Sequence, residues 1–349
     1  MIEVRPLGPD ADDRYAAFLD HLAVRSPRVL AYHHPIYRDM LAGAGAGTPL
    51  YLGAFDGPDL VGALPGFVAE SGHGACYCSL PYFGPNAGVL TDEGREGSAE
   101  VHRLLIGAVL RTMRERRAPL TAVFYAPFLF DCWELYRAPL GDVLEVDRQT
   151  QYLDLPSLGP FDAKLAYDIR KAERAGLSVT TDATDETLRL FYGVYEENCR
   201  EHGIPRKPFA AIQTLVRRGA PGGLARTYFA LQGNTLVGGL LVLWSAQVAS
   251  YYVPCARADA RPLQPGTLLI DRAIRDARAA GLRYWNWEAS PPDRAGVGAF
   301  KQKWGSQASS YKIFVKRFCD ESRLSAIGAA ELGRSFPYFF VYPYDRLAA

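Results

Sequence analysis

The spacing of apolar residues predicts two similar β-hairpins far apart in the chain. GAFDGPDLVGAL (53–64) and FALQGNTLVGGL (229–240) share an apolar strand, a short turn that contains Gly, the run Leu-Val-Gly and a second apolar strand. Short turns with Asp-Gly or Gly-Asn between two apolar runs are typical of hairpins. We therefore predict one hairpin in each half of the chain.

The pattern that follows each hairpin is also repeated. A third apolar strand comes next (ACYCSLPYF and VASYYVPCA), and a loop with Pro or Gly follows it. Apolar residues three or four positions apart then predict helices over about 98–117 and 265–280. A short strand follows each helix, at 119–126 and 282–289. The same elements in the same order favour a true duplication, although any two α/β halves look alike at this level of detail.

Two copies of this pattern predict an α+β protein in which each half is a mixed, largely antiparallel sheet flanked by helices. Pro156, Gly159 and Pro160 interrupt the pattern between the copies, so the join is expected within 145–165. We therefore divide the chain into domains 1–150 and 151–349. The segments between the two copies are predicted to be helices at 161–176, 184–202 and 208–218 and a strand at 177–181.

Composition and charge are those of a globular chain. The 349 residues are 48% hydrophobic and 22% charged, with a net charge of +1. This balance excludes a polybasic nucleic-acid coat but allows a local basic face. The N-terminal residues lack the apolar run of a signal peptide, and no stretch approaches the ~20 apolar residues of a membrane helix. We therefore expect a cytoplasmic protein without membrane insertion.

Six cysteines and six histidines are scattered along the chain, and no CxxC pair occurs. In an unexported chain such cysteines are expected to be reduced thiols. None of these residues has the spacing of a metal site, so we predict none.

Lysine is used sparingly, and two lysines stand together near the C-terminal end. All seven lysines lie at or after Lys164, and the segment GAFKQKWGS (298–306) places Lys301 and Lys303 between Phe300 and Trp304. Spacing alone favours an ordinary solvated turn that is anchored by its aromatic residues.

Three segments carry a resemblance to a known family: DIRKAERAGLSV (168–179), HGIPRKPFAAIQTL (202–215) and GLRYWNWEASPPDRAGVGAFKQKWGS (281–306). Together they resemble the Fem-type transferases, which consist of two tandem acetyltransferase-like (GNAT-like) domains and move an amino acid from aminoacyl-tRNA onto an amine. The resemblance covers about 150–318, and the first half fits mainly through the symmetry of the fold. GNAT-like acyltransferases with the same double fold share these patterns.

The resemblance implies roles for individual residues. Phe300 and Lys301 match the family's Phe-Lys pair, whose lysine is thought to stabilise the transition state. Arg206 matches an arginine that holds an anionic acceptor. The family's acceptor-binding lysine of the first domain should fall near PIYRDML (35–41), where Arg38, beside Tyr37, is the nearest cation. The missing lysine argues against a UDP-linked peptidoglycan precursor and favours a smaller amine acceptor.

The chemistry of aminoacyl transfer explains why these residue types would be needed. An amine attacks an ester carbonyl, and a cation held away from water stabilises the oxyanion of the tetrahedral intermediate. Phe300 and Trp304 would exclude water around Lys301. A general base would take the proton from the attacking ammonium. Glu288 and Asp293 are candidates, although carboxylates at strand ends commonly form turns.

Further residues are candidates for binding the two substrates. Tyr252, on the third strand of the second half, is a candidate acceptor contact, although aromatic strand residues more often belong to the core. Arg206 and Lys207 precede Pro208 at a predicted helix start, which would attract an anion. The predicted tRNA contacts are basic residues, although charged residues of this kind more often form a solvated surface: Lys303, Arg170, Lys171 and Lys312.

We therefore predict an amide-forming transferase with aminoacyl-tRNA as co-substrate and no cofactor, whose acceptor belongs to specialised metabolism, such as an antibiotic intermediate. The alternatives are an acyl-CoA-dependent N-acyltransferase, a transferase of cell-wall bridge formation, and a non-catalytic RNA- or protein-binding member of the fold. CoA binding usually needs a Gly-rich loop at a helix start. RPLQPGTLL (261–269) has one glycine and two prolines, and its first-half counterpart LTDEGREGSAE is acidic, so both count against CoA.

Overall fold

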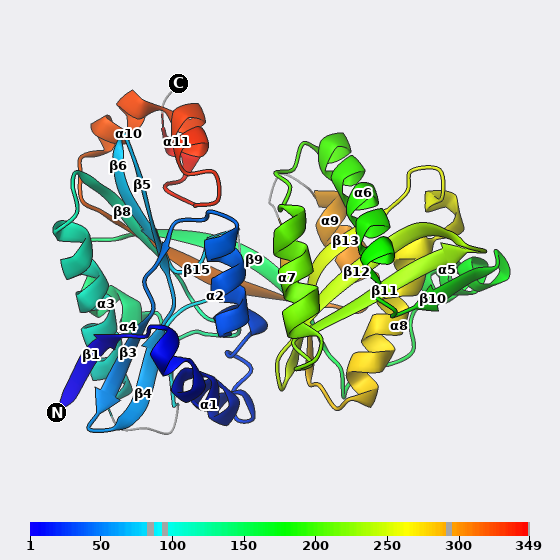
Figure 1. Ribbon diagram of the computed structural model, residues 1–349, viewed down its shortest axis with the longest axis horizontal. Helices are drawn as coiled ribbons and strands as arrows, with labels where there is room; N and C mark the ends of the chain where they lie inside the picture. Colours follow the sequence, from blue (N-terminus) through cyan, green and yellow to red (C-terminus); the bar gives the residue numbers. More distant parts are fainter. Residues whose placement is uncertain (82–86, 93–96, 291–294, 348–349) are drawn as a thin grey trace. The chain divides into compact units, whose positions relative to one another are not determined.

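The computed structural model describes residues 1–81, 87–92, 97–290 and 295–347, and its ribbon is drawn in Figure 1. The chain divides into two compact units. Unit 1 consists of residues 1–148 and 310–349, and unit 2 of residues 149–309. The domains expected from the sequence, 1–150 and 151–349, differ from this division in the C-terminal segment. Residues 310–349 belong to unit 1 because β15 (Gln307–Arg317) pairs with β8 (Pro119–Tyr125).

Unit 1 contains two groups of strands. One is a four-stranded sheet in the order β1-β3-β4-β7, and the other has the neighbours β15-β8-β6-β5-β2. The remaining elements of this unit are β1 (Ile2–Pro6), η1 (Pro9–Ala11), α1 (Asp12–Ala23), η2 (Ala31–His33), α2 (Pro35–Gly43), β2 (Thr48–Pro49), β3 (Leu52–Asp56), β4 (Asp59–Leu64), β5 (Phe67–Ser71), β6 (Gly74–Cys78), β7 (Leu90–Thr91), α3 (Ser98–Arg114), α4 (Glu134–Leu140), α10 (Glu321–Ile327), α11 (Ala329–Ser335) and η4 (Tyr344–Arg346).

Unit 2 contains six strands in the order β10-β11-β12-β13-β14-β9. Its strand pairs are antiparallel except for β13 and β14, which are parallel. The elements are β9 (Leu144–Asp154), which begins in unit 1, α5 (Ala163–Arg174), β10 (Leu177–Thr180), α6 (Asp185–His202), α7 (Phe209–Gly219), β11 (Ala225–Gln232), β12 (Thr235–Trp244), β13 (Val248–Ala256), η3 (Arg261–Leu263), α8 (Pro265–Ala279), β14 (Tyr284–Ala289) and α9 (Ala295–Gln302).

The two units repeat one arrangement of elements. The hairpins predicted at 53–64 and 229–240 are β3–β4 and β11–β12. In both units a later strand, a helix and a further strand follow, as β6-α3-β8 and β13-α8-β14, and the two strands of each set pair in parallel. The repeat is not exact, because β5 lies between the hairpin and β6 in unit 1, and β6 belongs to a different sheet from the hairpin. The expected join at 145–165 is partly occupied by β9.

Helices cover both faces of the unit 2 sheet, because successive strand residues point to opposite faces. Tyr228 and Ala230 share a buried core with α5 and α8. Phe229 between them faces the other way, and its ring centroid lies 5.7 Å from that of Phe191 on α6. Figure 1 shows α6 and α7 in green on the near side of these strands.

The parallel strands β13 and β14 of unit 2 are paired over only a short part of their length. β13 and β14 are paired only from Val248–Tyr284 to Ser250–Asn286. Beyond this point Val242 of β12 pairs with Tyr251 and Leu241 with Val253, so Tyr252 is the extra residue of a β-bulge. The second half of β13 therefore continues without β14 as a neighbour, and a gap opens between the two strands.

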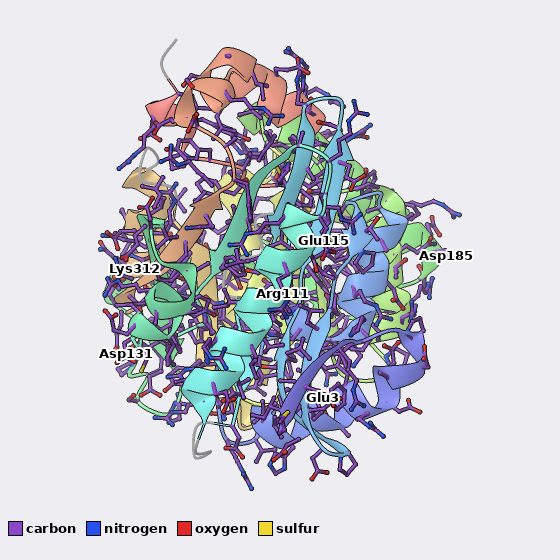
Figure 2. All side chains as sticks on the ribbon, turned by 90° about the vertical axis from the view of Figure 1, so that its left-hand side faces the viewer. Glu3, Arg111, Glu115, Asp131, Asp185 and Lys312 are labelled. Atoms are coloured by element: carbon purple, nitrogen blue, oxygen red, sulfur yellow. The ribbon has the colours of Figure 1, made fainter. Side chains whose placement is uncertain are left out.

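The amphipathic pattern of α3 places charged residues on its outer surface. Arg111 and Glu115, in and just after α3, are exposed, and Figure 2 labels both on the side of unit 1 that faces the viewer. In the described part of the chain, no helix has both the length and the apolar character that crossing a membrane requires.

We predict that Gly74→Ala destabilises unit 1 by at least about 2 kcal/mol. Gly74 begins β6 with φ +140°, and a Cβ there would lie 2.0 Å from the carbonyl oxygen of Ala118. Gly72, in the same turn, has no atom within 4 Å of such a Cβ. Gly72→Ala is therefore the matched control, with a change within about 0.5 kcal/mol. Urea unfolding monitored by circular dichroism measures both; equal effects of the two substitutions would contradict the prediction.

Candidate functional site in unit 2

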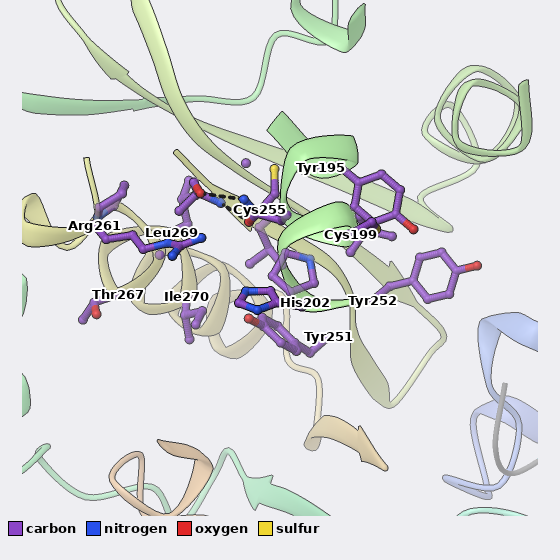
Figure 3. Close-up of a pocket in the computed structure, with 18 of the residues that line it drawn as sticks. Tyr195, Cys199, His202, Tyr251, Tyr252, Cys255, Arg261, Thr267, Leu269 and Ile270 are labelled. Atoms are coloured by element: carbon purple, nitrogen blue, oxygen red, sulfur yellow. Dashed lines mark hydrogen bonds between the residues drawn. The ribbon is translucent and has the colours of Figure 1, made fainter. Parts of the chain in front are cut away.

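A pocket of about 750 Å³ lies in unit 2. It is lined by residues of α6, of β13 beyond its pairing with β14, and of the start of α8 (Figure 3). Helices of both sheet faces can line one cavity because β13 and β14 have separated there. Most lining residues are apolar or aromatic, and none of the lining residues in the described structure is an Asp or Glu. The basic lining residues are Lys207, Arg261 and His202.

Lys207 enters the pocket from the segment between α6 and α7. Its Nζ lies 4.9 Å from the ring centroid of Tyr252, which is a cation–π contact. Burial lowers the pKa of the Lys207 ammonium to about 8, while Cys199 and Glu288 act in the opposite direction. Arg261 differs, because both of its terminal nitrogens are bonded to the Glu201 carboxylate.

Lys301, in the last turn of α9, is buried with 3% of its surface exposed. Its Nζ donates to the carbonyl oxygens of Glu288 and Ala289 and to Oγ of Ser290, each at 3.0 Å. These three acceptors use the three donors of the ammonium. Burial lowers the pKa of Lys301 to about 8, and the Glu288 carboxylate acts against this shift. Lys301 is therefore a buried charge that holds the end of β14.

Glu288 occupies a strained backbone conformation at the end of β14. Its φ is +61°, a left-handed value that is unfavourable for a residue other than glycine. Asn286 supports this conformation, since its Oδ1 accepts from the Glu288 N–H at 3.0 Å and its Nδ2 donates to Glu288 Oε1 at 2.7 Å. Thr150 adds a hydrogen bond from Oγ1 to the Glu288 carbonyl at 3.1 Å. Strain of this kind is typical of functional sites.

Glu288 thus lies close enough to influence both Lys301, which is buried, and Lys207, which is half-buried. Its carboxylate favours the charged form of Lys207 and of Lys301. A carboxylate between two ammonium groups can accept a proton from a substrate amine, and the ammonium groups can stabilise negative charge that develops nearby. Asp293, the other candidate base, lies outside the described residues, as do residues 93–96 of the acidic segment LTDEGREGSAE.

The aromatic residues next to Lys301 have different positions. Phe300 is partly buried and lines the pocket, and its ring centroid lies 6.1 Å from that of Trp287. Trp304 is only 1% exposed and packs in the core against Phe161. Phe300 therefore contributes to the pocket wall, whereas Trp304 anchors α9 from behind. Tyr252, the bulged residue of β13, also lines the pocket.

The other predicted acceptor contacts are not in this pocket. Arg206 is exposed, is ion-paired with Glu196 and lines a separate hollow with residues of α6. Arg38, in unit 1, is buried and bonded to Asp12 and Asp39, with Nη1 2.6 Å from Asp12 Oδ1. Tyr37 is fully buried, with its ring centroid 5.0 Å from that of Tyr32. The geometry of Arg38 and Tyr37 is that of residues that stabilise unit 1.

The predicted tRNA contacts fall into two groups. Lys303 and Arg170 of unit 2 are exposed, and Lys171, next to Arg170 on α5, is partly exposed. Lys312 lies in unit 1, and its Nζ is 2.7 Å from Asp147 Oδ1 and 3.0 Å from Glu145 Oε2. Two carboxylates compensate the Lys312 charge and raise its pKa, the Asp147 hydrogen bond contributing most. Among the described ion pairs, the positive charge of Lys312 is compensated by carboxylates, whereas the charges of Lys303, Arg170 and Lys171 are not.

The start of α8 differs from a glycine-rich anion loop. Gln264 precedes the helix with φ +66°, a conformation usually taken by glycine. Its Oε1 accepts from Thr267 Oγ1 at 3.0 Å. Pro265, the first residue of α8, has no N–H to offer. The side chain of Gln264 and the proline therefore leave fewer donors for a phosphate than a glycine-rich loop has.

The sequence resembles known proteins in the region that builds this site. Residues 161–288 match the family model described as acetyltransferase (GNAT) domain. No curated protein sequence gives a significant match.

Solved structures match over most of the chain at low identity. A structure of FemX has a TM-score of 0.66 and 11% identity, covering 89% of this chain and 96% of that chain. The C-terminal domain of a putative lysylphosphatidylglycerol synthetase from Agrobacterium fabrum has a TM-score of 0.60 and 13% identity, covering 93% and 96%. A tandem GNAT protein from the clavulanic acid biosynthesis pathway has a TM-score of 0.54 and 16% identity, covering 92% and 99%.

The fold is therefore the Fem-like tandem GNAT fold, an α+β arrangement of two GNAT-like domains with mixed, largely antiparallel sheets, as predicted from the sequence. The family model and the fold together support an acyltransferase of the GNAT type.

Sequence reasoning did not identify Asn286 and Ser290 as site residues. Lys207 was named only as part of a basic pair, because the family resemblance pointed to Arg206. Asn286 and Ser290 act through bonds to Glu288 and Lys301. The sequence does contain one indication for Asn286, since it is a polar residue between Trp285 and Trp287 in an otherwise apolar part of the strand.

We predict that burial of Lys301 makes unfolding depend on pH. The pKa is about 8 in the folded protein against 10.5 for the ordinary value. Between these values the unfolded chain binds more protons at this residue, so its contribution to stability rises as the pH rises. Lys301→Met removes this contribution, and the stability difference between wild type and variant should grow by on the order of 3 kcal/mol from pH 7 toward 10.5.

Urea unfolding at pH 7, 8, 9 and 10 measures this difference, and titration of Lys207 cancels because both proteins contain it. Lys303→Met is the matched control, because Lys303 lies two residues away in the same segment and is exposed. A flat difference for Lys301→Met would show that the Lys301 ammonium is not buried.

Proposed function

We propose that this protein transfers an aminoacyl group from aminoacyl-tRNA to an amine and forms an amide bond. The observation that carries the proposal is the buried ammonium of Lys301, bonded to the end of β14 at the strained residue Glu288, in a unit that holds an apolar pocket of about 750 Å³. The acceptor amine binds in the pocket as an ammonium or amine. Glu288 removes a proton, and the amine nitrogen attacks the ester carbonyl of the donor.

The tetrahedral intermediate places a negative charge on the former carbonyl oxygen. Lys301 stabilises this charge through the field of its buried ammonium, since a charge in a low-dielectric site acts over several ångströms without a direct hydrogen bond. Collapse of the intermediate breaks the C–O bond to the tRNA ribose, and the ribose oxygen leaves with a proton. The products are an amide and uncharged tRNA.

The start of α8 favours a donor other than acyl-CoA. Binding of the CoA pyrophosphate depends on free backbone N–H groups and on cations at a helix N-terminus. Here Pro265 lacks the N–H, Gln264 stands in the left-handed position with its side chain bonded to Thr267, and Arg261 is bonded to Glu201. The Fem-like tandem fold, with its resemblance to Fem-type transferases, points to aminoacyl-tRNA instead.

Exposed basic residues of unit 2 supply a surface for the tRNA backbone. Arg170 and Lys171 on α5, together with Lys303 after α9, have no carboxylate partner among the described ion pairs. Phosphate contacts of this kind position a nucleic acid without reading its sequence. The acceptor is proposed to be an intermediate of specialised metabolism.

We predict that Lys301→Ala lowers the transfer rate at least about 100-fold, the usual effect of removing one oxyanion-stabilising group. The assay supplies total tRNA charged with labelled amino acids and a panel of small amines, and follows label into the amines. Ribonuclease should abolish the transfer, and acyl-CoA should not support it. Filter binding should show a tRNA affinity within about twofold of wild type, because Lys301 is buried and contacts no surface ligand.

Lys303→Ala is the matched control in the same segment. It should weaken tRNA binding and leave the rate at saturating tRNA nearly unchanged. A comparable loss of rate in both variants would contradict the separate roles. Acylation that is driven by acyl-CoA and unaffected by ribonuclease would replace the aminoacyl-tRNA proposal with a CoA-dependent one.

A further inference from the structure

The pocket of unit 2 contains a cation that the proposed chemistry does not use. Lys207 lines the pocket, and none of the ion pairs among the described residues involves it. The two neighbouring arginines are occupied, Arg206 by Glu196 and Arg261 by Glu201. Among the lysine and arginine side chains that line this pocket in the described structure, Lys207 is therefore the one without an ion pair to a carboxylate.

The position of Lys207 is fixed by its backbone. Its N–H donates to the Tyr195 hydroxyl at 3.0 Å, and its carbonyl oxygen accepts from the Tyr192 hydroxyl at 3.1 Å. Both tyrosines project from α6, and the Tyr192 ring packs against Phe209 at the start of α7 with centroids 5.2 Å apart. The segment between α6 and α7 is thus held by the backbone N–H and C=O of Lys207. The Lys207 side chain then lies over the ring of Tyr252.

The ammonium of Lys207 is poorly satisfied where it lies. The face of Tyr252, 4.9 Å from Nζ, is a weaker partner for an ammonium than a hydrogen-bonded oxygen would be. Lys207 is half-buried at the pocket wall, and this partial burial lowers the pKa of its ammonium. An anion that entered the pocket would therefore be bound more strongly than it would be at a solvated lysine, because the pocket is largely apolar.

We propose that Lys207 binds the anionic group of the acceptor, and that the acceptor is a small amine with an apolar body and a single carboxylate. One compact ammonium matches one carboxylate, and the apolar and aromatic wall formed by Tyr251, Phe300 and Leu269 matches an apolar body. This inference rests on the proposed function, because esterification to tRNA consumes the α-carboxylate of the donor amino acid, and we assign the free carboxylate to the acceptor.

The placement of Glu288 is consistent with this orientation of the acceptor. The Glu288 carboxylate influences both Lys207 and Lys301. An acceptor whose carboxylate is held at Lys207 can extend its amine toward Glu288, where deprotonation takes place. A nucleoside diphosphate fits less well, since its two or more negative charges would meet a single uncompensated lysine.

Binding of two matched probes tests the proposal without turnover, so that its failure is distinguishable from failure of the aminoacyl-tRNA reaction. The probes are 3-phenylpropanoate and its amide, which differ in charge but little in shape, and their dissociation constants are measured by NMR titration of the full-length protein at pH 7. Wild type should bind the carboxylate at least tenfold more tightly than the amide. In Lys207→Met the two constants should agree within twofold, and Lys207→Arg should retain the preference.

Arg206→Met is the control, because Arg206 is adjacent in sequence but exposed outside the pocket. It should keep the tenfold preference. If Lys207→Met fails to fold, Lys207→Gln replaces it in the same comparison. Equal binding of both probes by wild type, an unchanged preference in Lys207→Met, or no binding of the carboxylate at 20 mM would each overturn the proposal. Tighter binding of ADP than of the carboxylate would overturn the assignment to a single anion.

Discussion

The separation of β13 from β14 is the constraint on which the site of unit 2 depends. In a continuous sheet, neighbouring strands use each other's backbone groups and leave no space between them. Here the pairing ends after Ser250–Asn286, and the bulge at Tyr252 turns the next part of β13 away. Side chains from helices on both sheet faces can therefore meet in one cavity. Strand β14 ends beside this gap, which places Glu288 near Lys301 and Lys207.

Two lysines of unit 2 hold their positive charges in different ways, since Lys301 is buried and Lys207 is half-buried at the pocket wall. Lys301 is stabilised by three oxygen acceptors, two of which are main-chain carbonyls at the end of β14. Removing it would leave buried acceptors without donors, so it serves structure as well as chemistry. Lys207 has an aromatic face instead of an oxygen partner among its described contacts. The first arrangement is complete within the protein, whereas the second leaves the ammonium without an oxygen partner among the described contacts.

The hairpins, the amphipathic helices and the duplication could be predicted from the sequence, because each depends on local periodicity. The position of β9 could not be predicted from the sequence. Pro156, Gly159 and Pro160 indicated a break between the two halves, whereas the structure has a strand that occupies the expected join up to Asp154. The roles of Arg206 and Lys207 could not be separated, because adjacent residues in an irregular segment point in directions that only the tertiary structure determines. Arg38 looked available in the sequence, but its partner Asp12 lies 26 positions earlier. Likewise, the bonds of Lys301 to main-chain carbonyls leave no signature in residue types.

The chain order of the two units has a consequence for how the protein is made. Unit 1 is discontinuous, since residues 149–309 of unit 2 separate β8 from its partner β15. During synthesis, domains generally fold as units in the order in which they emerge from the ribosome. Unit 2 has all of its strands when residue 309 has emerged, but β8 must wait for β15 with an unpaired edge. The second half of the chain can therefore be folded before the first half is finished, and the nascent N-terminal segment depends on protection from aggregation until then.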